Sequence, residues 1–385
     1  MRIFSLISTV ITLILLSSCN TGPVLVSTGA RHQEFQVYFG TYTQEHDGPS
    51  SKSLGIYRSK FDSETGTLTQ PRLAAEIESP SFLALHPSKQ FLYAVTESKE
   101  GTVSSFSIGS SGSLTKINTK STNGSAPCDL EVNPTGQMLV VANYHSGSTI
   151  AYAITEDGSL SNPTTFLNHE GSSVHKRQKS SHAHSVDFTP SSGHVIVSDL
   201  GTDKVMTMEV NPTTATIRLS SEISLAPGSG PRHFAFHPSG KFGYSLGELA
   251  STVTVMSHVS GKLKTIETLS TLPDGFVGHN TTAEIAVHSS GRFMYVSNRG
   301  HDSIAVFSVD TTSGRLSLTE VISSGGIRPR NFSIDPTGRY MLVAHRDSDN
   351  VVVFTIDQQT GVLYPTGSEI EIDAPVCVQF LELTS

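Results

Sequence analysis

Six segments of the chain share one pattern of hydrophobic and polar positions. In each, apolar and polar residues alternate over a short stretch, a polar turn with Pro or Ser follows, and a second alternating stretch comes after Gly or a substitute. Strict alternation predicts β-strands with one buried face, so each segment is expected to form two strands joined by a turn. The segments are SFLALHPSKQFLYAVTES, CDLEVNPTGQMLVVANYH, HSVDFTPSSGHVIVSDLG, RHFAFHPSGKFGYSLGEL, AEIAVHSSGRFMYVSNRG and RNFSIDPTGRYMLVAHRD.

The spacing of these segments predicts a β-propeller. Two further strand-like runs separate successive copies, for example residues 303–309 and 314–318, and no amphipathic helix of useful length is present. Four short strands in about 50 residues is the period of a propeller blade. The turn residues recur every 47 to 56 positions, at Pro87, Pro134, Pro190, Pro238, Ser289 and Pro336.

The two ends of the repeat region complete a seventh unit. Residues 36–42 match the second strand of a copy, and residues 376–380 match a first strand. A blade shared by both ends closes the ring and removes an exposed sheet edge. The sequence therefore predicts an all-β, seven-bladed propeller with four antiparallel strands per blade, in one domain that covers residues 35–385.

Residues 1–18 have the features of an export signal. Arg2 precedes an apolar stretch, residues 3–16, that is too short to span a bilayer comfortably. The residues Leu16-Ser-Ser-Cys19 resemble a bacterial lipobox, so we expect lipid on Cys19 and a tether over residues 19–34. This predicts an exported protein anchored in the cell envelope, on the periplasmic side of the outer membrane where the host has one. An ordinary secretory signal with an incidental Cys19 is the alternative.

Charge restricts the partners. The 385 residues include 26 Lys and Arg against 34 Asp and Glu, a net charge of −8. Phosphate contacts need a basic face, so nucleic acid is not expected as a partner, and the membrane is expected to be reached only through Cys19. The two remaining thiols, Cys128 and Cys377, fall on non-neighbouring blades, and we expect both to be buried and unpaired.

The register of the repeat identifies the side chains at one mouth of the central channel. In antiparallel neighbours the start of one strand lies beside the end of the next, so both sets should line the same mouth. Six residues before each turn, at the start of the innermost strand, stand Ser81, Cys128, His184, Arg232, Ala283 and Arg330, with Val376 in the closing blade. Ten residues after each turn, at the end of the second strand, stand Glu97, Tyr144, Leu200, Glu248, Arg299 and Arg346, with Tyr42 in the closing blade.

The Arg and His members of this ring cluster on four consecutive blades, together with Glu248. They are His184, Arg232 with Glu248, Arg299, and Arg330 with Arg346. Guanidinium groups around one concavity repel each other unless carboxylates or a bound anion balance them. The cluster favours an anion-binding site, with a set of structural ion pairs as the alternative.

One interval of the repeat is longer than the others, and its extra residues form a polar loop over residues 168–184. This loop enters the channel at His184, so it is placed to reach over the mouth. Its basic tetrapeptide, residues 175–178, is of a kind more often solvated than anion-binding. Four histidines lie close together (His169, His175, His182 and His184), but no Cys or carboxylate completes a metal-ligand pattern, and neither a metal nor another cofactor is expected.

At these residues the sequence resembles the seven-bladed propeller lactonase family, which includes bacterial propeller-type 6-phosphogluconolactonases and the fungal carboxy-muconate lactonising enzyme. The resemblance runs from about Gln36 to Glu382, although Ser181 stands where a Pro usually precedes the His pair. The motifs that carry it are Arg177-Gln178, His182-Ala-His-Ser185, Asp199-Leu-Gly-Thr-Asp203, Gly230-Pro-Arg-His233, Glu248-Leu249, Ala283-Glu-Ile285, Ser297-Asn-Arg-Gly300 and Arg328-Pro-Arg330.

The resemblance implies a catalytic set of His184 (or His182), Arg232, Glu248 and Arg299. It also implies a lactonase, in which arginines stabilise the oxyanion and Glu248 or His184 takes a proton from water. Sugar phosphates belong to the cytosol and this chain is expected to be exported, so the substrate is left open as a small anionic lactone or organic acid. Further substrate contacts are expected from His182, Arg330, Arg346, Arg177 and Gln178. Muconate-type cyclisation, ligand or protein capture without chemistry, and scaffolding in the envelope stand as alternatives.

Overall fold

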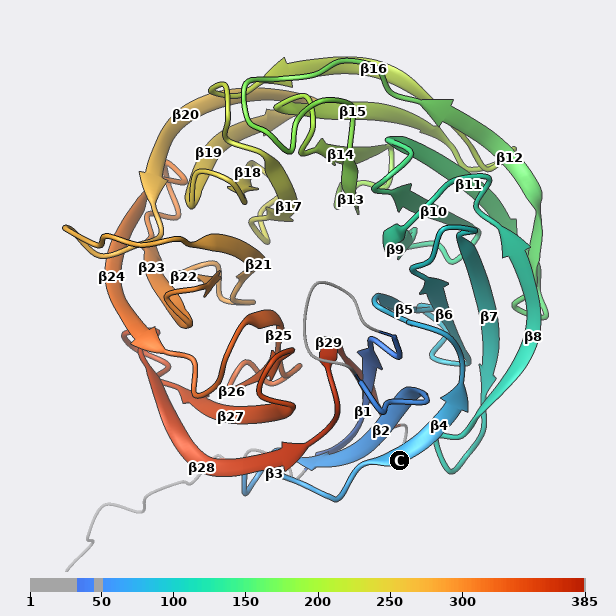
Figure 1. The fold of residues 1–385 in the computed structure, drawn as a ribbon, viewed down its shortest axis with the longest axis horizontal. Coiled ribbons are helices and arrows are strands. Elements are labelled where there is room, and N and C mark those ends of the chain that lie inside the picture. The colour runs from blue at the N-terminus through green and yellow to red at the C-terminus, as the bar shows by residue number, and fades with distance from the viewer. Residues whose placement is uncertain (1–32, 45–50, 384–385) are drawn as a thin grey trace, which may run out of the picture. The chain divides into compact units, whose positions relative to one another are not determined.

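The computed structural model describes residues 33–44 and 51–383, and in that part of the chain all regular secondary structure is β-strand. The expected export signal and Cys19 lie outside the described residues, as does most of the tether. In the described part no helix is long and apolar enough to cross a membrane. The strands form seven antiparallel sheets arranged as blades around a central axis (Figure 1). The prediction of a seven-bladed β-propeller is confirmed.

Six blades are continuous in sequence, and each runs from its innermost strand outward. Blade 2 contains β5 (Leu83–Leu85), β6 (Phe91–Thr96), β7 (Thr102–Ile108) and β8 (Leu114–Ser121); blade 3 contains β9 (Pro127–Val132), β10 (Met138–Asn143), β11 (Ser148–Ile154) and β12 (Leu160–Asn168); blade 4 contains β13 (Ala183–Phe188), β14 (His194–Asp199), β15 (Lys204–Asn211) and β16 (Thr216–Ser224). Blade 5 contains β17 (Pro231–Phe236), β18 (Phe242–Gly247), β19 (Thr252–Val259) and β20 (Lys262–Ser270); blade 6 contains β21 (Thr281–Val287), β22 (Phe293–Arg299), β23 (Ser303–Val309) and β24 (Leu316–Ser323); blade 7 contains β25 (Pro329–Ile334), β26 (Tyr340–His345), β27 (Asn350–Ile356) and β28 (Leu363–Glu371).

Blade 1 closes the ring with both ends of the repeat region. Its innermost strand is β29 (Pro375–Glu382), which pairs with β1 (Glu34–Thr41) from Phe35↔Glu382 to Thr41↔Pro375. β2 (Gly55–Asp62) follows, and the outer strand is split into β3 (Thr67–Leu68) and β4 (Arg72–Glu76), which both pair with β2. The split contains Pro71, which has no N–H to donate to a ladder. The predicted shared blade is confirmed, with five strands in place of four.

Contacts between blades hold the ring rigid. In four blades a buried Tyr on the second strand donates its hydroxyl to a glycine carbonyl of the next blade. Each such bond between buried groups contributes about 1 kcal/mol and fixes one blade against its neighbour. The pairs are Tyr38 with Gly112, Tyr93 with Gly158, Tyr244 with Gly314, and Tyr295 with Gly361.

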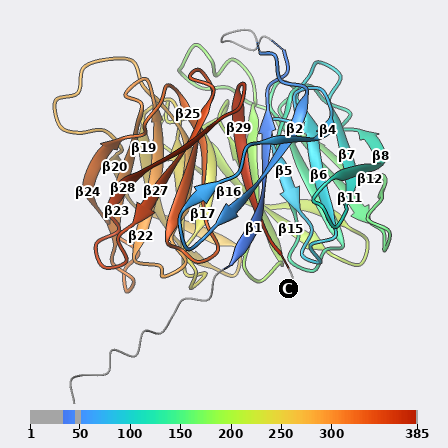
Figure 2. The ribbon, with the colours of Figure 1, turned by 90° about the horizontal axis from the view of Figure 1, so that it is seen from below.

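The register that was used to place the mouth residues is present in the sheets. The start of each innermost strand lies opposite the end of the second strand, as in Pro127↔Asn143 and Thr281↔Arg299. From the side, the strands run between two faces of the disc, and the loops between blades lie on one of them (Figure 2). That face carries the candidate site. Cys128 and Cys377 are both buried and free of disulfides, as expected.

Candidate active site

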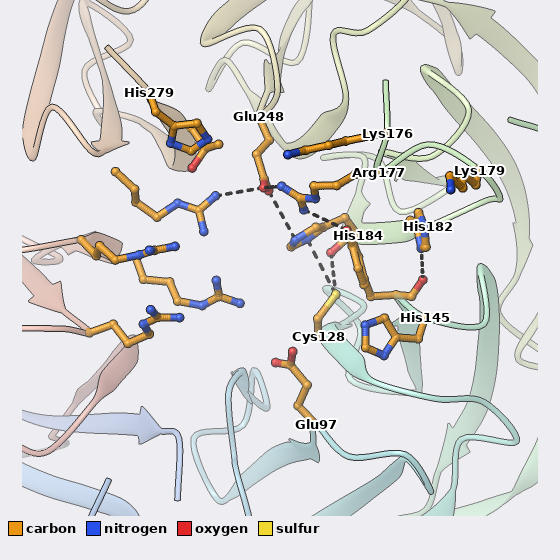
Figure 3. A pocket seen from close by; sticks show the side chains of 16 residues that line it. Glu97, Cys128, His145, Lys176, Arg177, Lys179, His182, His184, Glu248 and His279 are labelled. Carbon is orange, nitrogen blue, oxygen red and sulfur yellow. Dashed lines mark hydrogen bonds and ion pairs between the residues drawn. The ribbon is translucent and has the colours of Figure 1, made fainter. Parts of the chain in front are cut away.

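A cavity of about 580 Å³ opens at the mouth face, where the innermost strands begin. Seven of its lining residues are Lys or Arg and two are Glu, so the cavity is strongly cationic although the whole chain is acidic. Glu248 and Glu97 point into it from different sides, with His184 and Cys128 between them (Figure 3). The lining residues are Glu97, Cys128, Tyr144, His145, Lys176, Arg177, Lys179, His182, His184, Glu248, His279, Thr281, Arg299, Arg328, Arg330 and Arg346.

Glu248 is the buried centre of the cationic cluster. Its Oε1 lies 2.5 Å from Nη1 of Arg177 and 3.2 Å from Nη2 of Arg299, and its Oε2 lies 3.1 Å from Nε of Arg232. Burial alone would raise the pKa of this carboxyl, but the three guanidiniums lower it to about 2. Glu248 is therefore ionised at neutral pH and holds three arginines in place.

Arg232 and Arg299 are also fixed by backbone carbonyls. Arg232 donates from Nη1 to the carbonyl of Ala283, and Arg299 donates from Nη2 to that of Thr282 at 2.7 Å. Burial and the neighbouring guanidiniums lower the pKa of Arg299 to about 9, against the opposing charge of Glu248. Arg232 is 3% exposed and does not line the cavity; it lies against Glu248. The geometry thus commits both arginines to protein partners.

Arg330 also lines the cavity, but it is not held by an ion pair with a described residue. Its guanidinium lies over the ring of Tyr42, 5.2 Å from the ring centroid. Among residues 33–44 and 51–383, no carboxylate lies within ion-pair distance of Arg330. Two neighbouring arginines are paired with a carboxylate: Nε of Arg346 lies 2.5 Å from Oδ1 of Asp347, and Nε of Arg328 lies 3.5 Å from Oδ2 of Asp347. Arg330 therefore offers its donors to the cavity.

His184 faces the same space as a neutral imidazole. Its Nε2 lies 3.9 Å from Oε2 of Glu248, and its Nδ1 lies 3.7 Å from the Sγ of Cys128. Burial lowers the pKa of His184 well below its usual value, and the charges of Arg232 and Arg330 lower it further. The pKa of Cys128 is raised by burial, so its thiol stays protonated.

The long polar loop reaches the cavity, as its position in the repeat suggested. Arg177 extends from it to Glu248 and also donates to the hydroxyl of Tyr144 at 2.8 Å. Lys176 and Lys179 line the rim. His182 stacks on Tyr144 with ring centroids 4.6 Å apart, and lines the cavity beside His184.

Gln178 differs from the expectation of a substrate contact. Its side chain is fully buried and donates to the carbonyl of Leu200 at 2.8 Å and to Asp203 at 2.7 Å. Because both bonds lie within the protein, Gln178 supports the loop and does not face the cavity. In the described part of the chain, no three His, Cys, Asp or Glu residues are grouped so as to hold a metal ion.

Several lining residues were missed because the register covers strand ends and not loops. Arg328 had a signal, since it flanks Arg330 in a Pro-containing motif. Lys176 belongs to the basic tetrapeptide 175–178, which was expected to be solvated. The others, in loops or within two residues of a register position, had no signal; they are His145, Lys179, His279 and Thr281.

Comparison with known proteins places this geometry in a family. Residues 36–380 match the family described as "Lactonase, 7-bladed beta-propeller". A 6-phosphogluconolactonase of Bacillus subtilis is 38% identical over 348 residues, which cover 89% of this chain and 97% of that protein. A 6-phosphogluconolactonase of Formosa agariphila is 32% identical over 78% of this chain and 86% of that protein.

A solved structure gives the same result. The periplasmic gluconolactonase PpgL of Pseudomonas aeruginosa superposes with a TM-score of 0.86 at 33% identity, over 91% of this chain and all of that one. The expected fold, family and enzyme class are confirmed together. The chain belongs to the seven-bladed β-propeller lactonase family.

Proposed function

We propose that the mouth cavity hydrolyses the ring ester of a sugar-type lactone, with Arg330 as the donor to the developing oxyanion and His184 as the proton acceptor. The proposal rests on the contrast between Arg330, which has no carboxylate partner among the described residues, and the arginines that are paired with Glu248. Arg232 and Arg299 are held by Glu248 and by backbone carbonyls. Arg330 points into the cavity without such a partner among the described residues.

An uncommitted guanidinium is suited to stabilising a lactone transition state. Attack of water on the carbonyl carbon places negative charge on the carbonyl oxygen, and a preorganised donor in a shielded cavity lowers the energy of that charge. Arg299, which also lines the cavity, supports the same charge while it remains paired with Glu248. Catalysis by Arg330 therefore needs no rearrangement of the ion pairs at Glu248.

Proton transfer falls to His184 and not to Glu248. Glu248 has a pKa of about 2 and both of its oxygens are paired with guanidiniums, whereas the neutral imidazole of His184 lines the cavity and can accept a proton from the attacking water. The acyl–oxygen bond of the ring then breaks, and the ring oxygen leaves with the proton that His184 has gained. The product is a hydroxy acid. Glu248, 3.9 Å from Nε2 of His184, stabilises the transient imidazolium.

The substrate is proposed to be a gluconolactone, with or without phosphate. The relatives named above include two 6-phosphogluconolactonases and a periplasmic gluconolactonase. The cationic lining of the cavity, which includes Lys176, Lys179 and Arg346, favours a negatively charged substituent.

The experiment that tests this function is hydrolysis of δ-gluconolactone and of its 6-phosphate by the purified protein. The wild type is expected to exceed the spontaneous rate, and His184→Ala and Arg330→Met are expected to lose at least about 100-fold in kcat/KM. Arg218→Met is the matched control, because Arg218 is an exposed outer-strand arginine paired with Glu209. Rates for the wild type equal to those of buffer would contradict the proposal.

We also propose that the protein acts outside the cytosol, on the lipid anchor expected at Cys19. The periplasmic location in the name of the Pseudomonas relative supports this address. Fractionation of cells that express the wild type and Cys19→Ala tests it. The wild type should be found in the membrane fraction and the variant should not, and equal distributions would contradict the anchor.

A further inference from the structure

One carboxylate, outside the cavity, binds both the loop that carries Arg177 and the loop that leads into β17, the strand of Arg232. Asp203 lies in the turn between β14 and β15 and is 3% exposed. From the long polar loop it accepts hydrogen bonds from the hydroxyl of Ser173 at 2.5 Å and from Nε2 of Gln178 at 2.7 Å. From the loop before β17 it accepts the backbone N–H groups of Gly228 at 2.8 Å and Gly230 at 2.7 Å. The Ser229 hydroxyl adds a bond at 3.1 Å.

The same turn position in other blades shows which of these contacts are ordinary. Asp302 and Asp349 also have positive φ, 53° and 55°, close to the 55° of Asp203. Each caps the loop that leads into the next blade, through the N–H of Arg328 and of Ala374 respectively. Asp203 does the same for Gly228 and Gly230. Its bonds to Ser173 and Gln178 are additional, and they bind the long loop.

The bonds to Ser173 and Gln178 support the turn that carries Arg177 into the cavity. The N–H of Gln178 donates to the carbonyl of His175 at 2.8 Å, and the N–H of Ser173 donates to the carbonyl of Gln178 at 2.8 Å. Arg177 is presented from the turn that these bonds close, and it reaches Glu248 and Tyr144.

The loop before β17 also connects Asp203 to Glu248. Gly230 is followed by Pro231 and then by Arg232, the first residues of β17, and Nε of Arg232 lies 3.1 Å from Glu248. Asp203 is therefore connected to two of the three arginines around Glu248, one through each loop.

We infer that Asp203 is a positioning residue for the active site, which holds the Arg177 loop closed against Glu248. This inference rests on the proposed lactonase function for its kinetic consequence only. Asp203 touches neither the cavity nor a substrate, and its effect on the reaction passes through Arg177.

Asp203→Asn is the informative variant. Asn tolerates positive φ, so the turn itself is not strained. Three N–H groups, from Gln178, Gly228 and Gly230, converge on the two carboxylate oxygens. An amide has one accepting oxygen, so its NH₂ group must face either the N–H of Gly228 or the N–H groups of Gln178 and Gly230, and at least one of the two loops loses part of its support. Asp349→Asn is the matched control, because the loop that Asp349 caps contributes no lining residue to the cavity.

The first measurement is limited trypsin digestion of the folded protein, which needs no activity. Lys176, Arg177 and Lys179 are tryptic sites in the loop. Cleavage follows the population of the open loop, so Asp203→Asn is expected to be cut there about tenfold faster than the wild type and Asp349→Asn at the wild-type rate. Equal cleavage of all three proteins would overturn the inference.

The second measurement is a double-mutant cycle on lactone hydrolysis with Arg177→Met. We expect Asp203→Asn alone to lower kcat/KM by about tenfold or more, and to change it less than twofold when Arg177 is already Met. Losses that multiply would show that Asp203 does not act through Arg177 and would also overturn the inference. If the wild type hydrolyses neither lactone, the proposed function fails, and the digestion alone decides the role of Asp203.

Discussion

The guanidinium of Arg330 lies over the ring of Tyr42, with 5.2 Å between its central carbon and the ring centroid. A cation over an aromatic face is held without using its N–H groups, which lie in the plane of the guanidinium. The hydroxyl of Tyr42 donates to Oε2 of Glu97 at 3.0 Å, which fixes the ring. Arg330 is thus oriented by stacking and keeps its donors for an anion.

Arg330→Met is expected to lower kcat/KM for lactone hydrolysis by about 100- to 1,000-fold, because an oxyanion donor is removed. Arg330→Lys keeps the charge but loses the planar fork, so an intermediate loss is expected. Both variants should unfold at close to the wild-type temperature, since no ion pair with a described residue is broken. Steady-state kinetics and thermal unfolding on the same samples check this, and an active Arg330→Met would exclude the proposed role.

The pH dependence of hydrolysis follows from His184. A general base acts when it is deprotonated, and burial with neighbouring guanidiniums lowers the pKa of His184 well below 6.5. We therefore expect the acid limb of kcat/KM to lie below pH 6.5, with no loss of rate between pH 8 and 6.5. A pH profile in buffers of constant ionic strength measures it. A midpoint at pH 7 or above would rule out the neutral buried imidazole as the base.

Glu248→Gln is expected to cost about 3–5 kcal/mol of stability, because it leaves buried guanidiniums without their counter-charge. Inorganic phosphate should restore part of the loss by replacing the missing anion. The control is Glu222→Gln, in an exposed pair with Lys204, for which a change of at most about 1 kcal/mol is expected. Denaturant unfolding with and without phosphate measures both, and equal losses in the two variants would contradict the counter-charge role.

The carboxylate of Glu248 also makes the stability of the folded protein depend on pH in the acid range. The pKa of Glu248 is about 2 in the folded protein and higher in the unfolded chain, near 4.3. Its contribution to stability is therefore present above about pH 4.5 and is lost as the pH falls towards 2. Glu248→Gln should lack this part of the acid sensitivity. Unfolding curves of the two proteins between pH 5 and 3 should converge, and parallel curves would contradict the shift.

His345, a buried residue in blade 7, is expected to make the protein less stable at acid pH. It is fully buried, and neither ring nitrogen makes a hydrogen bond of good geometry to a described residue. Burial lowers its pKa to about 4, below the unfolded value near 6.5, so stability is lost as the pH falls from 6.5 to 4. At pH 5 this loss is roughly 2 kcal/mol.

The residues at the equivalent positions in blades 3 and 6 indicate a substitution that should remove this loss of stability. Asn143 and Asn298 stand there, and each donates from Nδ2 to a loop carbonyl and to a serine hydroxyl. His345→Asn should therefore gain stability relative to the wild type as the pH falls from 7 to 5. Thermal unfolding across this range measures it, and a difference that does not change with pH would contradict the titration of His345.

The number of blades and the closure of the ring could be predicted because each blade repeats one turn and one alternation of buried and exposed positions. The register also placed several of these side chains at the mouth where the cavity opens, because position along a strand determines which face of the disc a side chain is near. The split of the outer strand of blade 1 was not foreseen.

The depth of each side chain could not be read from the register alone. Arg232 and Arg330 occupy equivalent positions, yet Arg232 is buried against Glu248 and Arg330 faces the cavity. The difference lies in the residue 16 positions later. For Arg232 it is Glu248, which attracts it, and for Arg330 it is Arg346, which repels it and pairs with Asp347 instead. Gln178 could not be placed either, because its partner Asp203 belongs to a turn outside the register.

The shared blade has a consequence for how the chain becomes functional. β1 finds its inner partner only in Pro375–Glu382, so the first blade cannot be completed while the last segment is still unsynthesised. The ring therefore closes only after β29 has been made, and removal of this strand would leave β1 with a bare edge where aggregation can begin.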